Sequence, residues 1–107
     1  MSSGPQDEGS QSQRSAEPVV EGRFEIVNNL GLHARAATKL VQLASQFACE
    51  IEIAREGQKA NAKSVMGVLL LCGAKGTFVL VRARGPSANE AVTAIGALIA
   101  AKFGEAS

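Results

Sequence analysis

The chain contains no tryptophan and no tyrosine, and its 4 phenylalanines are its only large aromatic side chains. Aliphatic residues and alanine must therefore fill its interior. Cysteine is also scarce, with Cys49 and Cys72 alone. These two do not follow the spacing of a metal-binding motif, and a chain so poor in cysteine has no disulfide framework. We therefore expect two buried, reduced thiols in a cytosolic protein.

An excess of charge of either sign is missing as well. The 11 lysines and arginines nearly balance the 10 aspartates and glutamates, for a formal net charge of +1. This balance gives no basis for nucleic-acid or membrane binding. No uncharged apolar run reaches the roughly 18 residues of a membrane span, and the N-terminus lacks the apolar stretch of a signal peptide. We expect a cytoplasmic protein.

The length of 107 residues favours one domain. Residues 1–18 read MSSGPQDEGSQSQRSAEP, in which only Met1 and Ala16 are apolar. Such a segment cannot bury enough surface to offset the entropy of ordering it. We predict a disordered N-terminal extension over 1–18 and one folded domain over 19–107.

Hydrophobic periodicity predicts seven elements in that domain. Strands are indicated at 22–28, 50–54, 59–62 and 77–84. Helical spacing appears from 34 to about 47, over 64–71 and from Ser87 to about 103, with Ser64 and Ser87 as the capping residues. The order βαββαβα predicts an α+β open-faced sandwich, in which three helices cover one face of a four-stranded antiparallel sheet. Gly96 weakens the last helix, which indicates close packing of its backbone.

The single histidine, His33, stands where a strand-like run ends and a helical run begins. That position normally holds Ser, Thr, Asp or Asn, whose side chain caps free N–H groups. The first helical turn normally favours acidic residues because the helix N-terminus carries partial positive charge. Here the first turn holds Arg35 instead. Such a helix start is complete only when an external anion, such as a phosphate, meets the free N–H groups and the guanidinium.

Three chemical uses of His33 can be compared. If His33 bound a metal, further ligand residues would be expected at suitable spacing, and the sequence has none. We therefore expect no metal and no cofactor. General-base catalysis lacks a recognisable nucleophile or other catalytic group. A neutral imidazole attacks phosphorus well and also leaves well, which suits a carrier of phosphoryl groups. The spacing alone leaves open whether His33 is such a carrier or an exposed loop residue that precedes a helix.

Two motifs carry a resemblance to a known family. GLHARAA at residues 31–37 closely resembles the active-site motif of HPr, the histidine-containing phosphocarrier of the phosphoenolpyruvate-dependent phosphotransferase system, and AKSVMGV at residues 62–68 resembles its second signature. The similarity runs from about residue 22 to 104. NLGLHAR at residues 29–35 and AKG at residues 74–76 also look like the nitrogen-related branch. One departure is Ala36, where the family usually has the proline of His-x-Arg-Pro.

The resemblance implies a phosphorylated intermediate rather than an enzyme. His33 would be phosphorylated on Nδ1 by enzyme I and would pass the phosphoryl group to EIIA domains, and Arg35 would neutralise the phosphate. The backbone of Ala34, Arg35 and Ala36 would bind the phosphate. Ser64 would be the regulatory site for an HPr kinase/phosphorylase.

The implied partner surface lies at the starts of the first two helices, and the protein is expected to be a monomer. Its residues are Ala34, Thr38, Val65 and Met66. The sequence leaves open whether sugar uptake or nitrogen-related regulation is served. Two other functions also stay open: a purely regulatory interaction module of the same fold that acts through the Ser64 face, and a domain that binds a small ligand.

Overall fold

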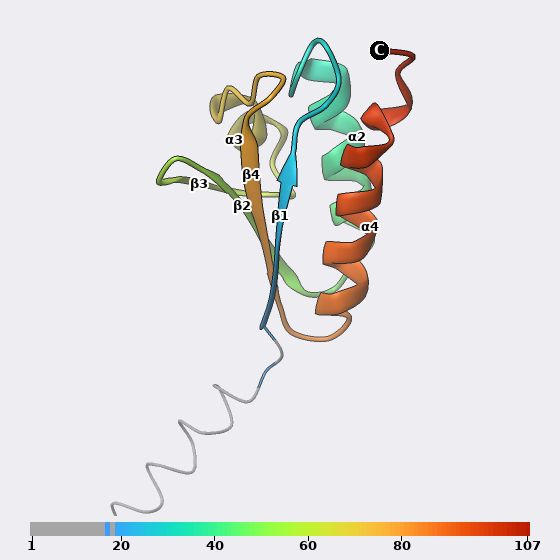
Figure 1. Cartoon of the computed structure of the whole chain (residues 1–107). Helices are drawn as coiled ribbons and strands as arrows, with labels where there is room; N and C mark the ends of the chain where they lie inside the picture. Colours follow the sequence, from blue (N-terminus) through green and yellow to red (C-terminus); the bar gives the residue numbers. More distant parts are fainter. Residues whose placement is uncertain (1–16, 18) are drawn as a thin grey trace, which may run out of the picture.

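The computed structural model describes residue 17 and residues 19–107. The extension predicted at 1–18 therefore lies, apart from Glu17, outside the described residues and stays a prediction. Figure 1 shows the described elements in their order along the chain. They are β1 (Val19–Glu25), α2 (Ala34–Ala44), β2 (Glu50–Arg55), β3 (Gln58–Asn61), α3 (Val65–Leu70), β4 (Phe78–Arg84), α4 (Ala88–Ala100) and the 3-10 turn η1 (Lys102–Gly104).

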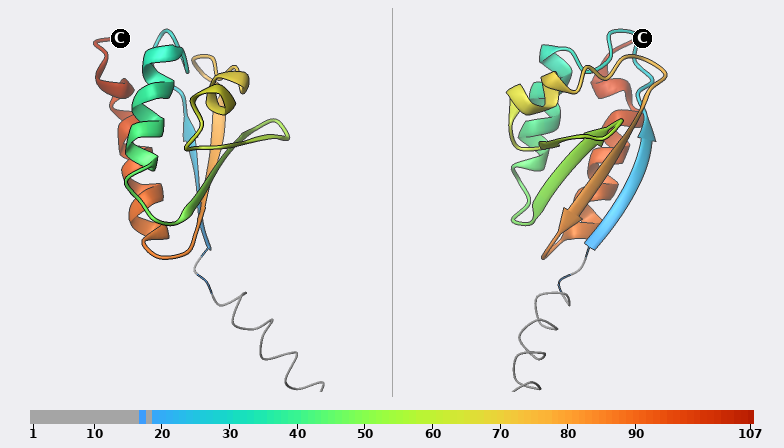
Figure 2. Two further views of the ribbon diagram at one scale, coloured as in Figure 1. Left: turned by 180° about the vertical axis from the view of Figure 1, so that it is seen from behind. Right: turned by 90° about the vertical axis from the view of Figure 1, so that its left-hand side faces the viewer.

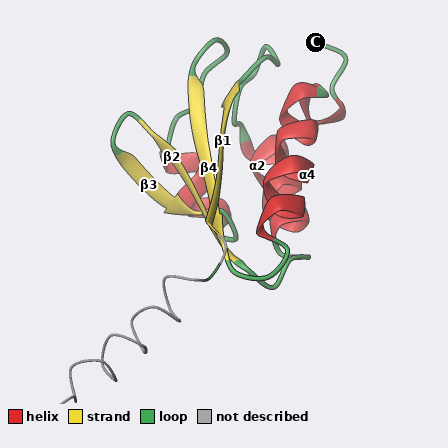
Figure 3. Ribbon diagram, turned by 60° about the horizontal axis from the view of Figure 1, so that its bottom comes forward, coloured by secondary structure: helices red, strands yellow, loops and turns green. Residues whose placement is uncertain are grey.

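The four strands form one antiparallel sheet in the order β1-β4-β2-β3. Helices α2 and α4 run side by side along one face of the sheet (Figures 2 and 3). The short helix α3 contacts β3 and the neighbouring α2. The other face is open. This arrangement confirms the predicted α+β open-faced sandwich.

Alternation along the strands divides the sheet into a core face and a solvent face. In β2, Ile51 and Ile53 are buried, whereas Glu50 is exposed and Glu52 is half-buried. Helix α2 buries Ala36, Ala37, Leu40 and Ala44 against this core. The periodicity of two in the strands and of 3.6 in the helices therefore places the apolar side chains as predicted.

Several predicted boundaries are wrong by a few residues. Strand β1 begins at Val19 and ends at Glu25 instead of spanning 22–28, and α2 ends at Ala44 instead of about 47. Val19 pairs with Arg84 and so joins the sheet at the far end of β4. Pairing with β4 therefore extends β1 beyond the residues whose polarity alternates. The local sequence does not show which strand is the partner.

Two local predictions are also wrong. Ser87 stands at the N-cap of α4, but its backbone is left-handed with a φ of 63°, and its side chain caps no N–H group. A capping side chain normally projects from extended backbone, so this geometry turns the hydroxyl away. Cys72 is exposed rather than buried, while Cys49 is buried as predicted and both are free thiols.

Candidate functional site

The loop of residues 28–32 positions His33 at the start of α2. Gly31 has a φ of +66°, and a Cβ atom on it would lie 2.3 Å from the carbonyl oxygen of Gly73. The backbone N–H of Leu32 donates to that same oxygen at 2.8 Å. Only glycine fits this position without strain, so the loop conformation before His33 is fixed by backbone contacts.

Helix α2 begins without a side-chain cap. His33 is the N-cap residue in extended conformation, its side chain caps no N–H group, and the first turn holds no acidic residue. The first main-chain bond of the helix runs from Ala37 N–H to His33 O at 2.8 Å. Among the described residues, the N–H groups of Ala34, Arg35 and Ala36 have no hydrogen-bond partner. The predicted incomplete helix start is confirmed.

The side chain of His33 instead turns to a residue near the other end of the chain. Its Nε2 is hydrogen-bonded to Oε2 of Glu105, and the two side chains are 24% and 11% exposed. The second carboxylate oxygen, Oε1, accepts from Nδ2 of buried Asn28 at 3.0 Å. The same Nδ2 donates to Gly31 O at 2.9 Å. The other ring nitrogen of His33, Nδ1, makes no hydrogen bond to the described residues.

The surroundings of Glu105 favour its ionised form. The hydrogen bond from Asn28 is the main cause, followed by the hydrogen bond and charge of His33 and by the charge of Arg35, and together they lower the pKa of the Glu105 carboxyl from its ordinary 4.5. Partial burial opposes this shift and is outweighed. Glu105 is therefore an acceptor at neutral pH.

Contacts of Phe103 and Ser107 with the rest of the domain hold the segment that carries Glu105 in place. Phe103 is fully buried, and its carbonyl oxygen accepts from Nζ of Lys39 at 2.7 Å. The main-chain oxygen of Ser107 accepts from Asn29 N–H at 3.0 Å. The side chain of Lys39, on α2, thus binds this segment. Phe103, at the predicted end of the last helix, lies beyond that helix in a left-handed turn with a φ of 55°.

Two residues of the site, Asn28 and Glu105, are not among those predicted from the sequence. Glu105 lies 72 residues from His33, and nothing in its local sequence distinguishes it from a surface glutamate. Only the docking of the last turn against α2 brings it to the histidine. Asn28 carried a weaker signal, since an asparagine directly before a glycine-containing loop often bonds its own backbone.

Ser64 caps α3, as predicted. Its Oγ accepts from Gly67 N–H at 3.1 Å, and the side chain is half-buried. Because α3 packs beside α2, the second motif lies near the first helix. The candidate partner residues Ala34, Thr38, Val65 and Met66 are all exposed. Two large apolar side chains outside that predicted set, Leu30 and Leu70, are each 67% exposed.

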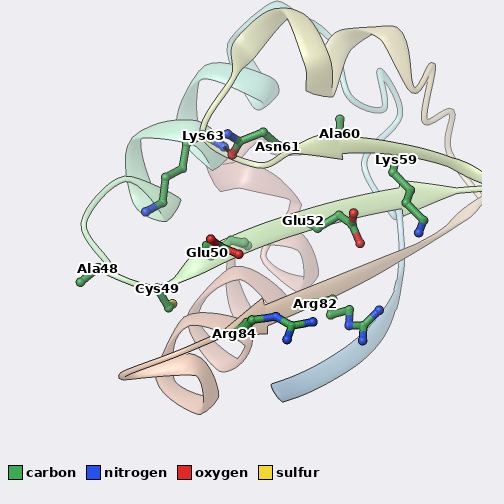
Figure 4. Close-up of a pocket in the computed structure, with 11 residues that line it drawn as sticks. Ala48, Cys49, Glu50, Glu52, Lys59, Ala60, Asn61, Lys63, Arg82 and Arg84 are labelled. Atoms are coloured by element: carbon green, nitrogen blue, oxygen red, sulfur yellow. Dashed lines mark hydrogen bonds between the residues drawn. The ribbon is translucent and has the colours of Figure 1, made fainter. Parts of the chain in front are cut away.

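A groove with a cavity volume of about 590 Å³ lies away from this site, on the open face of the sheet (Figure 4). Along its floor, Glu50 stands opposite Arg84 and Glu52 stands opposite Arg82 on the neighbouring strand. Such cross-strand charge pairs stabilise a solvent-facing sheet. The groove is also lined by Lys59 and Lys63, and Arg82 forms an ion pair with Glu21 of β1 at 3.4 Å.

The described part of the chain contains no group of three or more His, Cys, Asp or Glu side chains that could hold a metal ion. None of its helices has the length and apolar character needed to cross a membrane. The site around His33 holds one imidazole, the ionised carboxylate of Glu105, the guanidinium of Arg35 and three N–H groups that have no partner among the described residues.

Comparison with known proteins assigns this arrangement to a family. The family model described as "PTS HPr component phosphorylation site" matches residues 20–101. The chain belongs to the HPr family. Among similar HPr-family proteins, the phosphocarrier protein HPr of Cupriavidus necator is 48% identical over 80 residues, which are 75% of this chain and 90% of the relative. The phosphocarrier protein NPr of Shewanella violacea is 49% identical over 88 residues, 82% and 97% of the two chains.

Solved HPr structures agree with the fold. The crystal structure of HPr-C-His from Thermoanaerobacter tengcongensis superposes with a TM-score of 0.78 at 43% identity, covering 80% of this chain and 97% of the other. The crystal structure of the phosphocarrier protein HPr from Bacillus anthracis superposes with a TM-score of 0.72 at 35% identity, covering 74% of this chain and 94% of the other. The resemblance drawn from the two motifs is confirmed, and relatives named HPr and NPr both occur among the similar proteins.

Proposed function

We propose that this HPr-family chain accepts a phosphoryl group on Nδ1 of His33 from phosphorylated enzyme I and donates it to EIIA-type acceptors. The observation that carries the proposal is the start of α2, where His33 is followed by the exposed Arg35 and by three N–H groups that have no partner in the described part of the chain. A helix N-terminus with free N–H groups stabilises a phosphate dianion, and a guanidinium adds charge-assisted hydrogen bonds.

The transfer step needs only one nucleophilic nitrogen. The Nδ1 lone pair forms a bond to phosphorus while the bond between phosphorus and the donor breaks, and that electron pair stays on the donor. Donation to the acceptor reverses this exchange. Positioning and charge neutralisation supply most of the catalysis in phosphoryl transfer, and both are available here from Arg35 and the first turn of α2. His33 is consumed and regenerated, so the chain acts as an intermediate of the relay.

Exposed apolar side chains at the start of α3 and in the loop before α2 suit the docking of protein partners. Met66 and Leu30 are each 67% exposed and Val65 is 36% exposed, and exposed apolar groups that gather around a polar site favour an interface. Together with Ala34 and Thr38 they would meet enzyme I and EIIA domains. A phosphate on Ser64 would add about −2 charges next to this surface and weaken docking, so we propose Ser64 as a regulatory site wherever an HPr kinase/phosphorylase is present.

The experiment is phosphorylation with phosphoenolpyruvate and enzyme I. We expect a stable label in base that is lost in acid, as for a phosphoramidate, and we expect no label in His33→Ala. Ser64→Ala serves as the control, because it removes a phosphorylatable hydroxyl and should leave the label unchanged. A label that persists in His33→Ala would overturn the assignment. A wild-type chain that never labels with a competent enzyme I would favour a purely regulatory module.

A further inference from the structure

The carboxylate of Glu105 meets the imidazole of His33 on the ring nitrogen that does not react. This contact, together with the anchoring of residues 102–107, points to a second residue of the phosphorylation site. We propose that Glu105 is a positioning residue that holds neutral His33 in the tautomer with the proton on Nε2, which leaves the Nδ1 lone pair free for phosphorus. The inference rests on the proposed function of His33.

The direction of the hydrogen bond follows from the charge of Glu105. Its carboxyl is ionised at neutral pH and therefore only accepts. Neutral imidazole carries a single N–H, so an ionised acceptor at Nε2 draws the proton to that nitrogen. Nδ1 is then the atom with the lone pair, and it has no hydrogen-bond partner among the residues that the structure describes.

The carboxylate also has a role after the bond to phosphorus has formed. Attack by Nδ1 leaves the proton on Nε2 and places a formal positive charge on the ring. The ionised carboxylate beside Nε2 stabilises that charge without taking the proton, as the carboxylate of a catalytic triad does for its histidine. When the phosphoryl group leaves, the ring returns to the same tautomer.

Glu105 is itself fixed from two sides. Asn28 Nδ2 donates to Oε1 at 3.0 Å and is tied to Gly31 O at 2.9 Å. The backbone around Glu105 is anchored independently of its side chain, through the buried Phe103 and through the bond between Lys39 Nζ and Phe103 O. A change at the carboxylate alone should therefore leave the segment in place.

Glu105→Gln is the decisive variant. The amide has almost the shape of the carboxylate, but its NH₂ group can donate to Nε2 and so allows the proton to sit on Nδ1. We expect ¹⁵N NMR of the histidine ring, recorded at a pH where it is neutral, to show mainly the Nε2–H form in the wild type. In Glu105→Gln the Nδ1–H form should increase several-fold. Glu50→Gln, which removes a carboxylate from the far side of the sheet, should match the wild type.

The rate of labelling by enzyme I provides the second measurement. We expect Glu105→Gln to slow the phosphorylation of His33 by about 10- to 100-fold, by analogy with the loss of a carboxylate that orients a metal-bound histidine, and Glu50→Gln to leave the rate unchanged. Retention of the wild-type amide shift of Asn29 would show that residues 102–107 remain docked. Equal tautomer populations in the wild type and Glu105→Gln would overturn the inference, as would equal rates.

The two proposals fail in distinguishable ways. The tautomer measurement requires no phosphoryl donor, so it tests the role of Glu105 even in a chain that never labels. A wild type that labels on His33, with a tautomer independent of residue 105, would leave the proposed function standing and remove only the positioning role.

Discussion

The ring of Phe24 on β1 occupies the space that a Cβ atom on Gly96 of α4 would fill. Such an atom would lie 2.3 Å from Cε1 and 2.5 Å from Cζ of the ring. A Cβ on Gly22 would also meet the ring, at 2.6 Å from Cζ. Phe24 therefore fits between two glycines, which lets α4 approach the sheet closely.

This contact predicts the effect of Gly96→Ala. Alanine is about 1 kcal/mol better than glycine in a helix interior, but the added methyl group must displace the ring, and overpacking typically costs about 1–3 kcal/mol. We expect a net loss of stability, measured as the free energy of unfolding in denaturant. Thr93→Ala, at an exposed position of the same helix, should be neutral or slightly stabilising. A more stable Gly96→Ala would show that the ring moves at little cost.

Sequence patterns predicted those parts of the fold that depend on local chemistry. Ile51 and Ile53 point inward because alternation in a strand is a local rule, and Ser64 caps α3 because its hydroxyl reaches an N–H three residues away. The early start of β1 depends on pairing with Arg84, which lies far along the chain. The left-handed backbone at Ser87 likewise follows from how the chain passes from β4 into α4.

The same division applies to the candidate site. His33 and Arg35 could be selected because an uncapped helix start with a cation is an anomaly visible in the sequence. Glu105, the hydrogen-bond partner of His33, could not be predicted from the sequence. It reaches His33 only because the last turn docks onto α2, where Lys39 binds the Phe103 carbonyl. Local sequence thus predicts the candidate reactive residue, and tertiary packing determines which residue contacts it.

The lowered pKa of Glu105 predicts a pH dependence of stability. A carboxyl whose pKa is lower in the folded chain contributes stability that is complete above its unfolded value, near 4.5, and that is lost as the pH falls through its folded value. We expect the difference in unfolding free energy between the wild type and Glu105→Gln to shrink as the pH falls below about 4.5. Denaturant titrations at several pH values below about 4.5 measure this difference, and a difference that grows as the pH falls through this range would contradict the ionised carboxylate.

Arg35→Ala should separate transfer from folding. The side chain is exposed and follows the N-cap of α2, so its removal takes a cation away from the positive end of the helix. We expect the stability to be unchanged or to rise by about 0.3–1 kcal/mol, while labelling of His33 slows by about 10-fold or more because one charge-assisted contact is lost. We expect Arg35→Lys to be labelled at a rate between those of the wild type and Arg35→Ala. An unfolded Arg35→Ala would make Arg35 a structural residue.

The last prediction concerns Ala36, at the position where the resemblance to the His-x-Arg-Pro motif implies a proline. The N–H of Ala36 has no partner among the described residues, whereas the N–H of the next residue, Ala37, donates to His33 O at 2.8 Å. Proline is tolerated where the N–H is already free, but it costs about 3 kcal/mol or more where a helical hydrogen bond is lost. Both alanines are fully buried, so the two substitutions add a similar ring to the core.

We therefore expect Ala37→Pro to lower the free energy of unfolding by at least about 2 kcal/mol more than Ala36→Pro does. Ala36→Pro should also keep its label on His33, since Ala34 and Arg35 still present their N–H groups. Denaturant unfolding and the labelling assay measure the two effects on the same pair of variants. Equal destabilisation by the two prolines would mean that packing around α2, rather than its free first turn, decides which residues are tolerated after Arg35.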